Sequence, residues 1–128
     1  MMQKNSFLLI GNLCESYWHQ TLKEALSNIG SLEIQSEESS LSLVLKKNFS
    51  LIIVDAGGVY NPSCLVSRIR EVQPDARIVV MTASPTWKQA REMFYAGVTD
   101  YMRKLPNKDE LLPSFQEVLR KPVRYNRK

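Results

Sequence analysis

Residues 51–58, which read Leu-Ile-Ile-Val-Asp-Ala-Gly-Gly, decide the fold. An apolar, β-branched run without polar alternation is typical of a strand buried on both faces, as in a parallel sheet. The two glycines predict the turn that ends this strand. Open parallel sheets place their chemistry at the carboxyl ends of the strands. Asp55, the last residue of the run, is therefore the first candidate for a functional side chain.

Outside this run the chain alternates strand-like segments with segments of helical period. We expect strands at 7–10, 32–34, 51–55, 77–82 and 98–102. We expect helices from the Ser16 cap to a stop at Gly30, over 39–47, from Asn61-Pro62 to Val72, from Ser84-Pro85 to Gly97, and through Leu111 to Leu119. Such alternation favours right-handed crossovers and a parallel sheet. The prediction is an α/β fold, a three-layer sandwich.

Two of these helices carry a defined apolar stripe, and a third contains a conflict. The first has Trp18, Leu22, Ala25, Leu26 and Ile29 at helical spacing, and the fourth has Trp87, Ala90, Met93 and Phe94. Both stripes are expected to face the core. Pro113 lies inside the last helix, so that helix should either kink there or begin later than its capping candidate Asn107.

Composition indicates one globular domain. The chain has 128 residues, of which 44% are hydrophobic and 23% charged, and no apolar run reaches the length of a membrane span. We expect a domain over 1–121 and a basic tail over 122–128, without a signal peptide. From Arg103 onward eight Lys or Arg residues oppose three acids, yet no aromatic repeat accompanies them, so nucleic acid is not expected as a partner. Cys14 and Cys64 have no metal-binding spacing and are expected as free thiols in the cytoplasm.

Side chains that follow four of the strands should meet at one edge of the sheet. They are Gly11 with Asn12, Asp55, Thr82 and Lys104. An acid, a hydroxyl and an ammonium in one pocket suit phosphoryl transfer onto a carboxylate. In that chemistry Asp55 attacks, Thr82 donates a hydrogen bond to a phosphoryl oxygen, and Lys104 neutralises another.

Three stretches, at 51–55, 79–83 and 96–104, resemble the receiver domains of bacterial response regulators. The last reads Ala-Gly-Val-Thr-Asp-Tyr-Met-Arg-Lys, close to the Ala-Gly-Ala-x-Asp-Tyr-Leu-x-Lys pattern of that family. The resemblance implies a flavodoxin-like fold with strand order 2-1-3-4-5 and five helices. It also implies Asp55 as phosphoacceptor, Thr82 and Tyr101 as a switch pair, and a sensor histidine kinase or phosphotransfer protein as partner. A receiver of this kind is a signalling domain, not an enzyme.

The sequence departs from that family where the metal should bind. The family carries two adjacent acids after the first strand, and here Gly11-Asn12 stands there. Glu15 is expected to face away at the start of the first helix. Asp55, Asn12 and Gly57 are the residues left for Mg²⁺, which relies on carboxylates, so we expect weak binding at best. Without acidic neighbours, Asp55 should be ionised and held by Lys104.

Other chemistries are weaker. His19, the only histidine, is expected to be structural or solvent-facing, and no P-loop, dinucleotide or flavin phosphate motif is present. Arg91, Tyr95, Tyr101 and Arg103 could form a basic and aromatic docking surface on the fourth helix, the fifth strand and the last helix. Two hypotheses therefore stay open. One is a receiver in a two-component phosphorelay with impaired Mg²⁺-dependent phosphorylation, and the other is a phosphorylation-independent interaction module, with a downstream protein or a second copy as partner.

Overall fold

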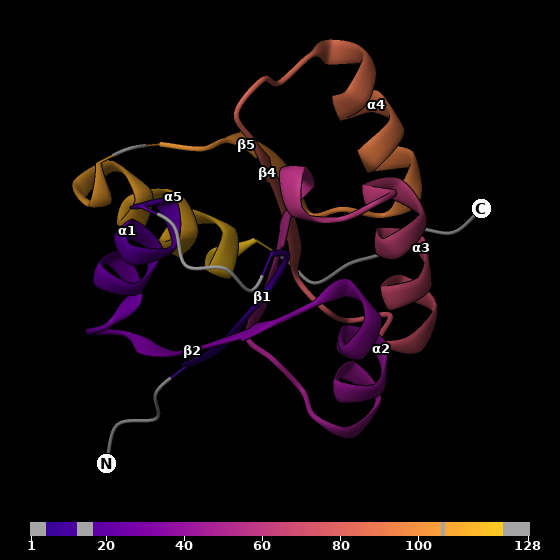
Figure 1. Ribbon diagram of the computed structural model, residues 1–128, viewed down its shortest axis with the longest axis horizontal. Coiled ribbons are helices and arrows are strands. Elements are labelled where there is room, and N and C mark those ends of the chain that lie inside the picture. The colour runs from indigo at the N-terminus through magenta and orange to yellow at the C-terminus, as the bar shows by residue number, and fades with distance from the viewer. Residues whose placement is uncertain (1–4, 13–16, 106, 122–128) are drawn as a thin grey trace.

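Strands and helices alternate along the chain (Figure 1). The structure is a computed structural model that describes residues 5–12, 17–105 and 107–121. The strands are β1 (Asn5–Ile10), β2 (Gly30–Gln35), β3 (Leu51–Asp55), β4 (Ile78–Thr82) and β5 (Asp100–Arg103). The helices are α1 (Tyr17–Leu26), α2 (Glu37–Lys46), α3 (Pro62–Val72), α4 (Trp87–Ala96) and α5 (Lys108–Arg120), and the 3-10 turn η1 (Ala56–Gly58) follows β3.

The five strands form one parallel sheet in the order β2-β1-β3-β4-β5. The predicted three-layer sandwich and strand order are therefore confirmed. In Figure 1, α1 and α5 cover one face of the sheet, and α2, α3 and α4 cover the other. None of the helices in the described part of the chain is long and apolar enough to cross a membrane.

The central strand β3 is buried along its whole length. Leu51 and Ile53 pack in the core cluster beside α1 and α5, while Ile52 and Val54 pack in the cluster beside α2, α3 and α4. Successive side chains of a strand point to opposite faces of the sheet. Asp55 therefore continues the series of Leu51 and Ile53 and points toward α1 and α5.

Gly30 is not the stop of the first helix, as the sequence analysis expected. The helix ends at Leu26, and Gly30 is the first residue of β2, where it pairs with Asn5. A Cβ at Gly30 would overlap the carbonyl oxygen of Asn5 and approach the Phe7 ring to 2.6 Å. The glycine is needed because two backbones approach closely, and β2 is consequently longer than the expected 32–34. The predicted Ser16 cap lies outside the described residues.

The cap-and-proline signal at Ser84-Pro85 does not start the fourth helix. Its N-cap is Thr86, whose side chain accepts a hydrogen bond from the Gln89 N–H at 3.1 Å. The Ser84 N–H instead donates to the Thr82 hydroxyl at 3.2 Å, which places Ser84 in the loop that leaves β4. The predicted stop at Gly97 is correct, because Gly97 has a φ of 110° and caps α4 in the left-handed conformation.

The expected core stripe of α4 is largely wrong. Trp87 is 74% exposed and Phe94 is 51% exposed, and Met93 is the buried residue of this helix. Trp87 lies in the first turn of α4, which the loop after β4 carries away from the sheet (Figure 1). Apolar spacing identified the helix but did not decide which of its side chains reach the sheet.

The last helix begins where its capping residue predicts. Asn107 Oδ1 accepts a hydrogen bond from the Asp109 N–H at 2.8 Å, so the alternative of a later start is wrong. Pro113 lies inside α5 on its exposed side, where water can replace the backbone hydrogen bond that proline removes. The predicted Asn61 cap of α3 is correct, since its side chain accepts from the Cys64 N–H. The fifth strand begins at Asp100 rather than Val98.

The guanidinium of Arg70 joins three segments at the amino edge of the sheet. Its side chain donates twice to the carbonyl of Gly97, at 3.1 and 2.7 Å. It also donates to the carbonyls of Pro74 and Ala76, at 2.8 and 2.6 Å. Arg70 is 7% exposed. This one residue of α3 therefore ties the loop before β4 to the end of α4.

Replacing Arg70 with Met should lower the free energy of unfolding by about 2–4 kcal/mol, because buried carbonyls lose their donors while the apolar stem is kept. Urea denaturation followed by circular dichroism measures this. Arg68→Met, an exposed position on the same helix, is the control and should change the free energy by less than about 0.5 kcal/mol. Equal effects of the two variants would contradict the assigned role of Arg70.

Candidate functional site

The carboxylate of Asp55 forms an ion pair at the carboxyl edge of the sheet. Lys104 Nζ lies 2.7 Å from Asp55 Oδ1, and the two side chains are 23% and 8% exposed. The backbone N–H of Lys104 donates to the carbonyl of Thr82 at 2.8 Å, which extends the pairing of β4 and β5 as far as Lys104. The structure therefore brings Asp55 and Lys104, 49 positions apart in the numbering, into direct contact.

The loop after β3 supplies a second donor to the same oxygen. The Gly57 N–H donates to Asp55 Oδ1 at 3.0 Å. The other carboxylate oxygen lies near Gly11, where an added Cβ would be 3.6 Å from Oδ2 and 3.0 Å from Asp55 Cβ. Asp55 thus has an ammonium and an N–H on one oxygen, and a residue without a side chain beside the other.

Gly58 closes the loop after β3 onto the loop after β1. A Cβ at Gly58 would lie 2.6 Å from the Asn12 nitrogen and 3.0 Å from the Gly11 Cα. Because these neighbours are backbone atoms, they cannot move aside as a flexible side chain would. Gly58 is therefore required by close packing of the two loops that flank Asp55.

Trp18 is a member of the site that the sequence analysis placed only in the core. Lys104 Nζ lies 5.6 Å from the centroid of the Trp18 ring, within the range of a cation–π contact. Trp18 lies in the first turn of α1 and packs, half-buried, against the core cluster beside α1 and α5. One sequence signal could have indicated this contact. Trp18 lies at the start of the helix that follows β1, which places it at the carboxyl edge of the sheet.

Thr82 and Tyr101 share a cavity on the other face of the sheet. This cavity measures about 350 Å³, and its lining includes Gly57, Thr82, Gln89 and Tyr101. The Tyr101 hydroxyl donates to Gln89 Oε1 at 3.0 Å and accepts from the Thr86 N–H at 3.4 Å. Tyr101 is therefore bonded to the start of α4. The roles of Thr82 and Tyr101 as a switch pair stay predictions.

The residues around Asp55 are poor ligands for Mg²⁺. One oxygen of Asp55 is already bonded to Lys104, Gly11 has no side chain, and the Asn12 side chain is exposed. Within residues 5–12, 17–105 and 107–121, no group of three His, Cys, Asp or Glu side chains could hold a metal ion. Mg²⁺ usually binds through one or two carboxylates together with phosphate oxygens. Glu15 lies outside the described residues.

The predicted docking residues lie on α4 and β5. Arg91 and Arg103 are exposed, Tyr95 is 78% exposed, and Tyr101 is half-buried. A hollow of about 470 Å³ on α4 is lined by Lys88, Gln89, Arg91, Glu92 and Tyr95. The exposed Trp87 and Phe94, which the sequence analysis assigned to the core, enlarge the aromatic part of this surface.

The sequence analysis also singled out His19, the two cysteines and the basic tail. His19, on α1, is 2% exposed, which agrees with a structural role. Cys64 is an exposed free thiol, and Cys14 lies outside the described residues, as does the basic tail at 122–128.

No protein-family model and no curated protein matches the sequence. Solved structures do match the fold. The chemotaxis response regulator CheY4 of Vibrio cholerae has a TM-score of 0.79 at 20% identity, with 91% of this chain and 99% of that chain covered. A response regulator of Burkholderia pseudomallei with a phosphorylated aspartic acid has a TM-score of 0.74 at 23% identity, with coverages of 94% and 69%.

A third similar structure is an atypical orphan response regulator, described as having a phosphorylation-independent regulatory mechanism. Its TM-score is 0.76 at 23% identity, and 90% of this chain and 95% of that chain are covered. At these identities the comparisons show the fold, and the chain has the fold of response regulator receiver domains.

Asp55→Asn should lower the free energy of unfolding by about 1–3 kcal/mol at neutral pH, because Lys104 then loses its counter-charge inside the fold. Asp75→Asn, at an exposed turn, is the control, with an expected change below about 0.5 kcal/mol. Chemical denaturation of the two variants beside the unchanged protein measures the difference. A stabilising effect of Asp55→Asn would show instead that a second carboxylate repels Asp55.

Proposed function

We propose that this chain is a receiver-type signalling domain in a two-component phosphorelay. Asp55 occupies the phosphoacceptor position, and Mg²⁺-dependent phosphorylation of it is impaired. The partner upstream is a sensor histidine kinase or phosphotransfer protein, and the domain itself is not an enzyme. The receiver fold and the place of Asp55 at the end of the central strand support this proposal.

The observation that supports the impairment is that Lys104 alone balances Asp55: its Nζ lies 2.7 Å from Asp55 Oδ1, and Gly11-Asn12 stands where the family has two acids. Two unit charges about 4 Å apart attract by about 4 kcal/mol at an effective dielectric near 20, before desolvation is counted. A metal ion or phosphodonor must displace part of this attraction. Phosphoryl transfer also depends on cations that neutralise the developing charge, and Lys104 supplies a single positive charge in place of a lysine and a metal together.

Thr82 and Tyr101 give such a domain its means of response. The Thr82 hydroxyl accepts a hydrogen bond from Ser84 in this structure and can still donate to a phosphoryl oxygen. If Thr82 moves toward a modified Asp55, the cavity that it shares with Tyr101 changes shape, and Tyr101 is bonded to α4. That connection runs from the modified carboxylate to the exposed surface of α4.

Incubation with Mg²⁺ and a small phosphodonor such as acetyl phosphate should phosphorylate the chain slowly and incompletely, as followed by intact mass. Asn12→Asp supplies a second carboxylate beside Asp55 and should raise the apparent Mg²⁺ affinity about tenfold, equivalent to about 1.4 kcal/mol. Asn28→Asp makes the same chemical change at an exposed turn before β2, at the opposite edge of the sheet from Asp55. This variant should leave the Mg²⁺ affinity unchanged. Rapid, near-complete phosphorylation of the unchanged protein would contradict the proposed impairment.

The second candidate function is a phosphorylation-independent interaction module. It is favoured by the exposure of Trp87, Phe94 and Tyr95 on a single helix, because aromatic residues are enriched in protein interfaces. Such a module keeps the receiver fold and docks a downstream protein through α4 and β5.

If docking is independent of phosphorylation, the same partner should co-purify with the unchanged protein and with Asp55→Asn. Trp87→Ser should weaken that binding about tenfold or more, because exposed Trp residues at interface centres commonly contribute above 1.4 kcal/mol. Tyr60→Ser, at a residue that is 95% exposed on the loop after η1, is the matched control and should bind normally. Loss of binding in Asp55→Asn would favour the phosphorelay function instead.

A further inference from the structure

The ammonium of Lys104 has two partners that come from different parts of the fold. Asp55 Oδ1 is 2.7 Å away, at the end of β3. The ring of Trp18, on α1, has its centroid 5.6 Å away. An aromatic face attracts a nearby ammonium, more strongly when the ammonium is partly withdrawn from water. Lys104 is 23% exposed, so both contacts act in a partly desolvated setting.

The position of the Trp18 ring is determined by packing. Trp18 packs against the core cluster that contains Leu22, Leu111 and Phe115. Its indole nitrogen is buried and has no hydrogen-bond partner among the described residues. A buried N–H without a partner is unfavourable, and Phe or Leu would fill this space without one. The property that the indole adds is its π face, which is the strongest of the aromatic side chains for a cation.

We propose that Trp18 is a positioning residue, which holds the Lys104 ammonium against Asp55 so that the pocket contains its own cation. This deepens the proposed function, on which it rests for the importance of the pair. Opening of the pair, by modification of Asp55 or by a competing cation, changes the contact on Trp18. Asp55 is thereby connected to α1, on the face of the sheet opposite Tyr101.

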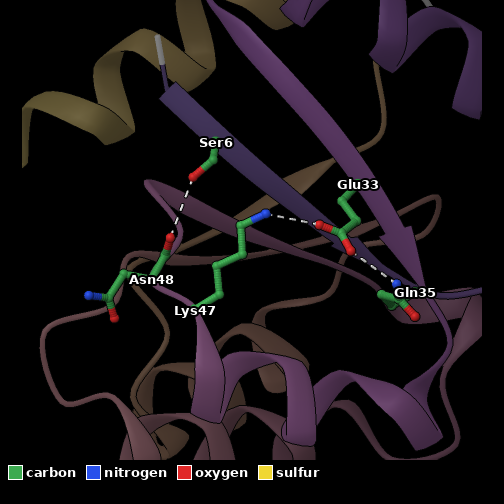
Figure 2. Close-up of polar contacts among 5 residues, drawn as sticks. All are labelled: Ser6, Glu33, Gln35, Lys47 and Asn48. Carbon is green, nitrogen blue, oxygen red and sulfur yellow. Dashed lines mark hydrogen bonds and ion pairs between the residues drawn. The ribbon is translucent and has the colours of Figure 1, made fainter. Parts of the chain in front are cut away.

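A second lysine with the same kind of contacts provides an internal control. Lys47 Nζ lies 3.3 Å from Glu33 Oε1 and 5.2 Å from the centroid of the Phe49 ring. Figure 2 shows Lys47 reaching from the end of α2 to Glu33 on β2, close to the Ser6–Asn48 hydrogen bond. Nothing about this pair involves Trp18 or Asp55, so its behaviour should not change when Trp18 is replaced.

Trace acetylation of lysines, read by peptide mass spectrometry, tests the proposal. An amine that is bonded to a carboxylate and packed against a ring is less accessible to an acylating reagent. Trp18→Leu should raise the acetylation rate of Lys104 about two- to fivefold, the size of a weak to moderate cation–π contact. Trp18→Phe keeps an aromatic face and should stay within about twofold of the unchanged protein, while the Lys47 rate should be constant in all variants.

An unchanged Lys104 rate in Trp18→Leu, with a constant Lys47 rate, would overturn the proposal. If the Lys47 rate also rises, the leucine variant has lost its fold, and Trp18→Met, which keeps more of the volume, takes its place. A second measurement leaves Trp18 intact. The indole N–H resonance of Trp18, assigned by comparison with Trp87→Phe, should shift in both Asp55→Asn and Lys104→Met, and an unmoved resonance in both refutes the proposal.

These outcomes are separable from those for the proposed function. Rapid phosphorylation of Asp55 would refute the impairment, whereas protection of Lys104 by Trp18 would still be seen in the unmodified protein. Conversely, slow phosphorylation with an unprotected Lys104 would leave the impairment in place and remove Trp18 from it.

Discussion

The ion pair between Asp55 and Lys104 is the interaction on which the rest of the site depends. A carboxylate that is 8% exposed at the end of a wholly buried strand needs an opposite charge, since removing an unpaired charge from water is strongly unfavourable. Parallel strands bring Lys104 to it because β5 ends at the same edge of the sheet as β3. Gly57 and Gly58 let the loop after β3 pack tightly beside this pair. The Gly57 N–H donates to the Asp55 carboxylate.

The residues beside this pair differ from those of the family that the sequence resembles. The family that the sequence resembles clusters carboxylates, which repel one another until a metal ion arrives. Here Asp55 is paired with Lys104, and Gly11 lies beside it where the family has an acid.

The candidate site residues are divided between the two faces of the sheet. Asp55, Lys104 and Trp18 belong to the face covered by α1 and α5, whereas Tyr101 belongs to the core cluster beside α2, α3 and α4. Tyr101 is bonded to Gln89, and the same helix exposes Trp87, Phe94 and Tyr95. Exposed apolar patches often mark interaction sites, which is why the docking proposal is placed on α4.

By itself, the sequence determined the fold class, the number and order of the elements along the chain, and the contact of Asp55 with Lys104 at one edge of the sheet. Hydrophobic periodicity and turn residues can be recognised locally in the sequence. In a parallel sheet the strand ends that they identify lie at one edge, so the residues that follow the strands come close together. Only the tertiary structure showed that Trp18 contacts Lys104 as well as the core. It also showed that Trp87 and Phe94 are exposed and that Gly30 belongs to β2. Apolar spacing says that a helix has one apolar side, but not how far that helix extends past the sheet. The start of a helix depends on the geometry of the preceding loop. Here the Ser84 N–H donates to the Thr82 hydroxyl, and the N-cap of α4 is Thr86. Contacts between residues distant along the chain, such as Trp18 with Lys104, depend on packing that no local pattern records.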